Sequence, residues 1–414
     1  MFTLALCVVL LTQFQRLQRE YAPVIVTGNM ERTRKVFLCV IFMMITPSHE
    51  DLLSGVQLVT DLSNHLVPKL FQALAPGREN LVFAPFGLAT NIAMLLEGAH
   101  GDTAKEILKA LNLSPKSLDN MRTGFKAYCE TFEEVGGSFN MALMLASQPL
   151  LSSYRQTLNR FYRANITVTS TFQNFTGIAP DNVSLELRSD SGVMSHWQDY
   201  ERLASFSFLS HQDAAPFHRT PSEVVTVPMI PQVGVFRASR LEQLSAYAVE
   251  LPLEVRTVSL LLLVPDSADN LDELLVKLSK VSLQQLVQEW LPETEFSVSL
   301  PQFTIVSSSI DLTPFLRQLG IRSVFNASSA NLSSASKSPS VYVKSVTQDA
   351  YFSTSFVAVN SVGAVSSNLV PKRTRSKRDA SSLTVDRPFL FFLLHRDTQL
   401  VLLAGKVQNP TQVP

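Results

Sequence analysis

Apolar residues recur at helical spacing through the first part of the chain. Residues 53–76 carry a leucine at every fourth position and predict an amphipathic helix: Leu58, Leu62, Leu66, Leu70 and Leu74. Residues 79–85 predict a short buried strand stopped by a proline, and residues 87–101 predict a buried helix that ends in glycines. Residues 102–111 repeat the one-sided apolar pattern behind Asp102, a residue type that favours helix N-caps.

After about residue 220 the pattern changes to runs that are typical of strands. These runs are rich in valine, phenylalanine and threonine, and turn residues bound them. They cover residues 224–230, 247–253, 258–265, 296–306, 341–360, 388–395 and 400–407. Two amphipathic helices, at 270–279 and 311–320, interrupt the series. The helices come first along the chain and most strands come later, in sheets long enough to be packed on both faces. This order predicts an α+β architecture.

The composition is that of a neutral globular chain. The sequence has 414 residues, and its 35 lysines and arginines equal its 35 aspartates and glutamates. A balanced charge gives no reason to expect nucleic acid as a partner, because a basic excess supplies most of that affinity. Charged residues make up 17% and apolar residues 46%, which indicates a folded chain. No repeat or linker divides it, so we expect one domain over residues 49–414. We also expect the protein to be a monomer.

Two apolar stretches precede this domain. The first, residues 3–11, has no basic residue before it. The second, residues 36–45, follows Met30 and a basic segment and leads into small residues, which is the order of a secretory signal peptide. Its ten apolar residues are too few to span a bilayer, which takes about twenty. We expect a signal peptide over 30–48, secretion without a membrane anchor, and a doubtful extension over 1–29. The alternative is one long N-terminal extension.

Glycosylation sequons fit an extracellular destination. Five Asn-x-Ser/Thr sites lack a disqualifying proline: Asn165, Asn174, Asn182, Asn326 and Asn331. Several such sites behind a signal peptide predict a secreted glycoprotein.

No pattern for metal or catalytic chemistry is present. Of three cysteines only Cys129 lies beyond the leader, so no disulfide framework is expected. Neither Cys-x-x-Cys nor His-Glu-x-x-His spacing occurs, and the seven histidines have no Gly-x-Ser-x-Gly elbow beside them. We therefore predict a protein that is not an enzyme and that uses no metal or cofactor.

Several segments together resemble the serpin family of serine protease inhibitors. LTVDRPFLFFL (383–393) matches the C-terminal signature of that family, and LLAGKVQNP (402–410) resembles its closing strand. Further blocks are similar in the family's order: residues 80–111, 261–279, 300–305 and 311–333. The resemblance covers about residues 52–414. It implies the α+β serpin fold, with eight or nine helices, three β-sheets and an exposed reactive loop.

The resemblance also locates the reactive loop, at about residues 361–385. In serpins a glycine hinge begins this loop and an Asp-Arg-Pro-Phe block follows it. Here the block is residues 386–389, at a spacing from Gly363 that the family commonly shows. The hinge would comprise Gly363, Ala364, Val365 and Ser366. This implies that the cleaved loop inserts as a new strand in a large sheet and distorts a covalently attached protease, so that the native state is metastable.

The run RSKRDASS (375–382) lies where a serpin presents its bait. Family register implies cleavage after Lys377. A trypsin-like protease needs one basic residue, whereas a furin-like convertase prefers Arg-x-Lys/Arg-Arg, which this run matches with cleavage between Arg378 and Asp379. Either protease would hold the basic side chain in an acidic pocket. The upstream basic residues would contact further subsites: Arg373 and Arg375. The choice of bond stays open, as does a loop whose charges only keep it soluble.

Several positions that tune sheet opening differ from the family. Its Ser-Pro-x-Ser is here residues 84–87, Ala-Pro-Phe-Gly, and the histidine ten residues before the hinge glycine is replaced by Ser353. An inserting strand would bury the amide of Asn368 and would meet Pro371, which lacks a ladder donor. Two hypotheses follow: a suicide-substrate inhibitor of a basic-specific protease, or a non-inhibitory serpin (carrier, chaperone or precursor) that is merely cleaved at the dibasic site.

A basic helical face is a candidate contact for glycosaminoglycan. Its members are Lys105, Lys109, Lys116, Arg122 and Lys126. Acidic residues alternate with them, namely Glu106, Asp119 and Glu130, so a solvated helix face is favoured. The sequence therefore predicts at most a weak glycosaminoglycan contact.

Overall fold

The computed structural model describes residues 49–135, 141–168, 184–194, 214–253, 257–338, 341–354 and 381–412. The chain separates into two units, Met1–Ser54 and Gly55–Pro414. The second unit holds the sheets and the hydrophobic core. The first contributes only the start of one helix to the described residues, so the predicted signal peptide lies outside them.

The helices form where apolar residues recur every three to four positions. Within the described ranges there are eight α-helices: α3 (His49–Leu74), α4 (Pro85–Gly98), α5 (Gly101–Ala110), α6 (Leu118–Val135), α7 (Ser152–Tyr162), α9 (Leu271–Leu278), α10 (Leu283–Glu289) and α11 (Thr313–Gln318). Pro85 begins α4, as suits a residue whose φ is fixed and whose missing N–H is not needed at the first helical position. Every residue of α4 except Glu97 is buried, which confirms the predicted buried helix.

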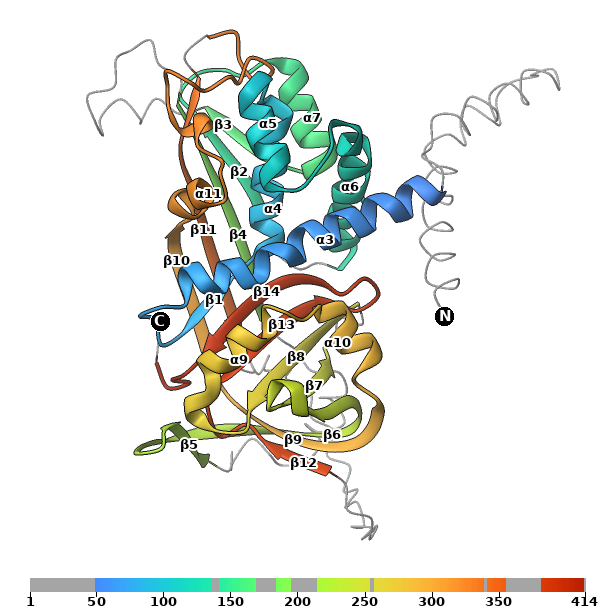
Figure 1. Cartoon of the computed structure of the whole chain (residues 1–414), viewed down its shortest axis with the longest axis vertical. Coiled ribbons are helices and arrows are strands. Elements are labelled where there is room, and N and C mark those ends of the chain that lie inside the picture. The colour runs from blue at the N-terminus through green and yellow to red at the C-terminus, as the bar shows by residue number, and fades with distance from the viewer. Residues whose placement is uncertain are drawn as a thin grey trace, which may run out of the picture. The chain divides into compact units, whose positions relative to one another are not determined.

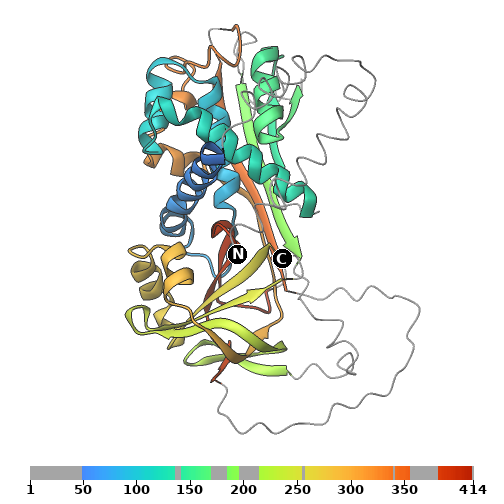
Figure 2. The same ribbon diagram turned by 90° about the vertical axis from the view of Figure 1, so that its right-hand side faces the viewer.

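A five-stranded sheet lies beside α4 to α7, whereas α9 and α10 lie beside the other sheet (Figures 1 and 2). Its strands, in spatial order, are β10 (Thr304–Asp311), β11 (Tyr342–Ser353), β4 (Ser184–Met194), β2 (Met141–Ala146) and β3 (Asn165–Val168). The two central strands, β11 and β4, run parallel, whereas β10 with β11 and β2 with β4 are antiparallel. Helix α4 packs against β4 on one side and β14 on the other, so it lies inside the core.

The remaining strands form a nine-stranded sheet. Its main path is β1 (Leu81–Phe83), β14 (Leu400–Val407), β13 (Phe389–His395), β8 (Val258–Pro265), β7 (Ala246–Pro252), β6 (Glu223–Leu241), β9 (Glu293–Pro301) and β12 (Ser381–Thr384), and β5 (Ala214–Thr220) pairs with β6. The long strand β6 pairs with β9 along one stretch and with β7 along the next. Two of the three expected sheets are therefore joined through one continuous strand.

One strand predicted from the sequence is wrong. Residues 296–306 divide into β9 and β10, which belong to different sheets. The break falls at Gln302 and Phe303. It follows Pro301, the last residue of β9, which cannot donate to a ladder, and the buried Phe303 redirects the chain into the core. There the ring of Phe303 packs against those of Phe352, Phe389 and Phe391, with centroids 5.6–5.9 Å away. This aromatic cluster ties the two sheets together.

Candidate functional site

The candidate site is the central strand pair of the five-stranded sheet, together with the anchors of the segment that follows it. Strands β4 and β11 are in register from Ser184 beside Tyr342 to Met194 beside Ser353, with a bulge after Val343. The chain leaves β11 for residues 355–380, which lie outside the described residues, and re-enters at β12 in the other sheet. The segment is therefore held at its two ends by two different sheets.

All predicted hinge and bait residues fall in that segment. Gly363, Ala364, Val365 and Ser366 of the hinge lie outside the described residues. So do the recognition and cleavage residues Arg373, Arg375, Lys377, Arg378 and Asp379. The assignment of the scissile bond therefore stays a prediction, and the geometry available is that of the anchors and of the sheet.

On the inner face of the strand pair, a buried glutamine binds the start of α4. The Gln348 side chain accepts a hydrogen bond from the Ala84 N–H (2.8 Å) and donates one to the Ala84 carbonyl (2.9 Å). Its amide also donates to Ser189 Oγ on the neighbouring strand (3.1 Å). Gln348 is 1% exposed and the other two residues are fully buried. One amide thus connects both central strands to the β1–α4 junction.

This contact accounts for Gly87, one of the departures at residues 84–87. A Cβ added at Gly87 would lie 3.0 Å from Ser189 Oγ and 3.2 Å from Gln348 Nε2, so a larger residue would crowd the amide. Ser353, which replaces the family's histidine, contacts the neighbouring strand β10 instead. Its hydroxyl pairs with Thr304 Oγ1 at 2.7 Å. Sequence reasoning missed Gln348. The only signal was a polar residue at an inward position of an alternating strand.

Charged and aromatic side chains join the same two strands on the outer face. Arg188 of β4 pairs with Asp190 on its own strand (2.8 Å) and with Asp349 of β11 (2.6 Å). Hydrogen bonding to Asp190, with the charge of both carboxylates, raises the pKa of Arg188. Further along, the Tyr351 ring lies over Gly192, where an added Cβ would fall 1.7 Å from a ring carbon. The strand pair is therefore held together on both faces.

The C-terminal anchor is built by the Asp-Arg-Pro-Phe block. The Val385 N–H donates to the Ser299 carbonyl (2.8 Å), which extends the pairing of β12 with β9. The Asp386 carbonyl accepts from the His218 N–H (2.7 Å), and Arg387 donates from Nε to the Pro265 carbonyl (2.8 Å). Phe389 is fully buried. This end of the segment is fixed firmly to the nine-stranded sheet.

Three of the five predicted glycosylation sites are described, and all three are exposed. Asn165 lies on the edge strand β3, whereas Asn326 and Asn331 lie in turns after α11. The Asn326 side chain accepts hydrogen bonds from the N–H and hydroxyl of Ser328, and Asn331 accepts from the Ser333 N–H. Asn174 and Asn182 lie outside the described residues.

The candidate glycosaminoglycan face is largely neutralised by its own acids. Lys105 pairs with Asp102, and Lys126 pairs with Glu130. Arg122 pairs with Asp119 and, through two hydrogen bonds of 2.8 and 2.6 Å, with Glu97, whose side chain is 3% exposed. Among the described residues, the other two members of the predicted set, Lys109 and Lys116, form no ion pair.

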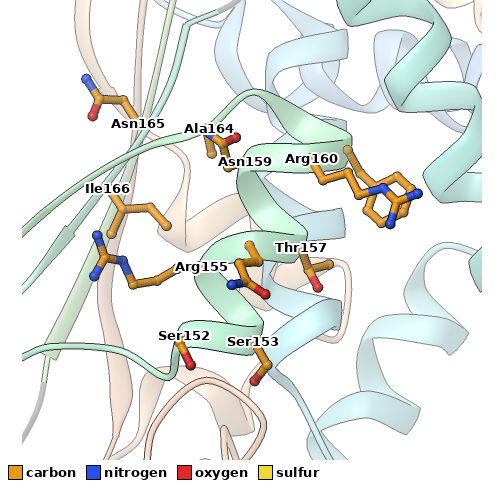
Figure 3. A pocket seen from close by; sticks show the side chains of 11 residues that line it. Ser152, Ser153, Arg155, Thr157, Asn159, Arg160, Ala164, Asn165 and Ile166 are labelled. Carbon is orange, nitrogen blue, oxygen red and sulfur yellow. The ribbon is translucent and has the colours of Figure 1, made fainter. Parts of the chain in front are cut away.

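A shallow groove of about 900 Å³ lies along the exposed side of α7 and the start of β3 (Figure 3). Arg155 and Arg160 both line it but point to different sides of the helix, and Arg160 lies on the ring of Phe161 at 5.2 Å. The groups in the groove do not converge on one point. Within the described ranges, no three His, Cys, Asp or Glu side chains are placed to hold a metal ion, and no helix is long and apolar enough to span a membrane.

Comparison with protein families gives one match along most of the chain. Residues 61–182 and 205–410 match the model of the family described as serpin (serine protease inhibitor). The chain belongs to the serpin family. Strand β4 falls between the two matched segments. The family model therefore does not include the β4 residues that contact β11, namely Arg188, Ser189 and Gly192.

Known serpins are similar to this chain over most of its length. Serpin B8 of Bos taurus is 26% identical over 364 residues, which is 80% of this chain and 93% of the relative. The mouse protein Z-dependent protease inhibitor superposes with a TM-score of 0.68 at 20% identity, over 88% of this chain and all of the other. The structure of native protease nexin-1 with heparin gives a TM-score of 0.66 at 18% identity, over 87% of this chain and 99% of the other. The α+β serpin fold predicted from the sequence is confirmed.

Proposed function

We propose that this serpin is a secreted suicide-substrate inhibitor of a serine protease that cleaves after lysine or arginine. The observation that carries the proposal is the parallel pairing of β4 with β11 along the length of β4. A strand that turns back after Ser353 would run antiparallel to β11. It would therefore be antiparallel to both neighbours if it entered between them. Antiparallel pairing is slightly more stable per residue than parallel pairing. Insertion would thus replace one parallel interface by two antiparallel ones, which favours it energetically.

The anchor geometry supports the same proposal. A cut after Lys377 or Arg378 would free the hinge side of the segment, while β12 and the Asp386–Phe389 block hold the other side. A protease joined to the freed side through its acyl bond would then move with the inserting strand. Arg375 and Arg373 would contact further subsites. In this mechanism the serpin supplies a substrate loop and a sheet that opens, and no catalytic group of its own.

Secretion remains part of the proposal. The segment 30–48 has the order of a signal peptide, and the three described sequon asparagines are exposed, as glycan attachment requires. Protease nexin-1 was solved with heparin, and a heparin-like contact here would have to rely on Lys109 and Lys116, since the other candidate cations are paired. We therefore propose at most weak glycosaminoglycan binding.

A non-inhibitory serpin is the second candidate, and the double-faced locking of β4 to β11 favours it. The Gln348 amide on one face and the Arg188–Asp349 pair on the other both oppose separation of the strands. If the strands part too slowly, the protease would complete hydrolysis and leave a nicked serpin. A carrier role has less support. The groove between α3 and α10, lined by His65 and Phe71, holds about 270 Å³, below the usual range of about 300–1,000 Å³ for ligand sites. The groove along α7 is within that range, but it is shallow and its polar groups do not converge on one point.

Mixing the purified protein with trypsin and, separately, with furin tests the proposal. A complex that survives denaturing electrophoresis, and that Arg378→Ala or Lys377→Ala abolishes, would support trapping and identify the bond. A clean nick with full protease activity would contradict trapping and support the second candidate. Heating the cleaved protein gives an independent result, because insertion should raise its melting temperature well above that of the intact chain. Mass spectrometry of the secreted chain tests the cleavage site of the leader.

A further inference from the structure

Two carboxylates lie opposite each other across the interface between β4 and β11, which we call the seam. In the register of this strand pair, Asp190 of β4 is the partner of Asp349 of β11. Neighbouring strands lie about 4.8 Å apart, and paired residues point to the same face of the sheet. Like charges placed opposite each other on neighbouring strands destabilise the pairing. The seam therefore contains two charges that repel each other.

One arginine lies between these two carboxylates and pairs with both. Arg188 Nε is 2.8 Å from Asp190 Oδ1, and its Nη2 is 2.6 Å from Asp349 Oδ2. The other Asp349 oxygen accepts a hydrogen bond from the Ser309 N–H at 2.7 Å, which fixes the orientation of that carboxylate. The three charged side chains are between 23% and 46% exposed, so dissolved ions reach them. Arg188 therefore converts a repulsive pair into an attractive cluster that salt weakens.

A second ion pair crosses the seam nearer the start of both strands. Lys344 Nζ of β11 is 3.1 Å from Glu186 Oε1 of β4, and the two side chains are 33% and 25% exposed. This pair joins one cation to one anion. Loss of Lys344 would leave one carboxylate without that cation, whereas loss of Arg188 would leave two carboxylates opposed. The two pairs are therefore alike in exposure and differ in what remains when the cation is removed.

Insertion of a strand between β4 and β11 would pull the Arg188 cluster apart. The backbones of Asp190 and Asp349 would then be two strand spacings, about 10 Å, from each other. Arg188 would keep only one of its two carboxylates at that separation. Residues 363–370, which include the predicted hinge, contain no charged residue that would replace the lost contact. Opening of the seam therefore costs the attraction that Arg188 supplies.

We propose that Arg188 is a positioning residue that keeps two opposed carboxylates together, and that it makes trapping of a protease depend on ionic strength. The inference rests on the proposed inhibitor function. The Debye length falls from about 30 Å at 0.01 M salt to about 3 Å at 1 M. Screening weakens the net attraction in the cluster, so the strands part sooner at high salt. The protein then traps more of the protease at high salt and is cleaved without trapping more often at low salt.

Annealing of a synthetic peptide measures opening of the seam without a protease. The peptide copies residues 359–370, which carry no charged side chain, and its ends are acetylated and amidated, so salt does not act on its approach. The rise in melting temperature with incubation time gives the annealing rate. At low salt, Arg188→Gln should anneal about tenfold faster than wild type, because two carboxylates are left opposed. Lys344→Gln, the matched control, should change the rate by at most about threefold.

The sign of the salt dependence separates this role from a merely structural one. Salt should speed annealing to wild type, where it screens an attraction, and slow annealing to Arg188→Gln, where it screens a repulsion. Addition of Asp349→Asn to Arg188→Gln removes the opposed charge and should return the rate to within about threefold of wild type.

Three results would overturn the inference: a wild-type rate that does not change with salt, an Arg188→Gln rate that rises with salt, or no annealing to any of the proteins. If Arg188→Gln does not fold, the salt response of wild type decides alone. Wild-type protein that still forms the denaturation-resistant complex with trypsin in any of these cases would leave the proposed inhibitor function standing. A clean nick by trypsin at both low and high salt would overturn that function as well.

Discussion

Gln348 and Ala84 form a two-way hydrogen-bonded pair across a wide gap in the sequence. The glutamine amide both accepts from the Ala84 N–H and donates to the Ala84 carbonyl, at 2.8 and 2.9 Å. The pair is buried, so neither backbone group has water as an alternative partner. It therefore couples the inner face of the central strand pair to the start of α4.

Gln348→Ala should destabilise the protein by about 2–4 kcal/mol, because the buried Ala84 N–H loses its partner, the Ala84 carbonyl keeps only the Leu88 N–H, and a small cavity opens. The change would be measured as a lower midpoint of urea unfolding by circular dichroism. Gln285→Ala is the control, since Gln285 is exposed on α10 and its side-chain amide donates to Glu289 of the same helix; it should shift stability by less than about 0.5 kcal/mol. Equal midpoints for the two variants would contradict the assigned role of Gln348.

Gly192→Ala should destabilise the protein through Tyr351. The added methyl would collide with the tyrosine ring that lies over Gly192, so the ring must leave its position over that residue. We expect a loss of about 1 kcal/mol. The measurement is a double-mutant cycle by thermal unfolding, in which the loss should disappear when Tyr351→Ala is already present. A loss of the same size in both backgrounds would mean that the ring is not the cause.

Arg122→Ala should be one of the most damaging changes among the charged residues. It would leave the Glu97 carboxylate, whose side chain is 3% exposed, without its cation and with only the Tyr162 hydroxyl as a partner. Breaking a buried pair in this way costs about 3–5 kcal/mol. Arg240→Ala is the control, because Arg240 pairs with Glu242 and Asp266 at the surface, where such pairs contribute about 0–1 kcal/mol. Chemical denaturation of both variants would measure the difference, and similar losses would contradict the prediction.

The protein should lose stability as the pH falls below about 6.5, partly through His395. Burial lowers the pKa of His395 from its ordinary value of 6.5, and the nearby Asp397 opposes this less strongly. The ring packs against Tyr128 and Phe132, and its Nδ1 meets Thr398 Oγ1 at 2.9 Å. The unfolded chain would take up a proton near pH 6.5 while the folded chain would not, so stability falls with pH until the lowered pKa is reached.

Melting temperatures between pH 7.5 and 5.0 measure this effect. His395→Gln, which cannot titrate, should reduce the acid-dependent loss. His100→Gln, at an exposed position, should retain the wild-type loss because His395 is still present. An identical pH dependence in all three proteins would show that His395 makes no contribution.

Much of the fold could be predicted from local pattern. The leucines of α3 and the alternating strands around the core follow periodicities that short windows reveal, and the block from Asp386 to Phe389 identified the loop anchor. The Gln348–Ala84 contact could not be predicted, because it depends on the register between elements 264 residues apart. Strand β4 was also missed. It does alternate, with Leu185 and Leu187 inward and Glu186 and Arg188 outward, but its outward charges resemble those of a loop.

The exposure of Val233 and Val235 on β6 could not be predicted either. Exposed and buried valines look alike in a strand sequence, and only the pairing of β6 with β9 and β9 with β12 shows which valines face solvent beside the anchor. The bait residues from Arg373 to Asp379 remain predictions of the family register, because they lie outside the described residues.

The position of β14 has a consequence for biosynthesis. This strand lies between β1 and β13, and Leu81 pairs with Lys406. A ribosome makes β1 early and β14 last among the described strands, so the early strand waits without its neighbour for most of translation. Contacts between such distant segments form slowly and leave edges open to aggregation. Folding of this protein should therefore finish only after release from the ribosome, and chaperones that shield the early hairpins would raise its yield.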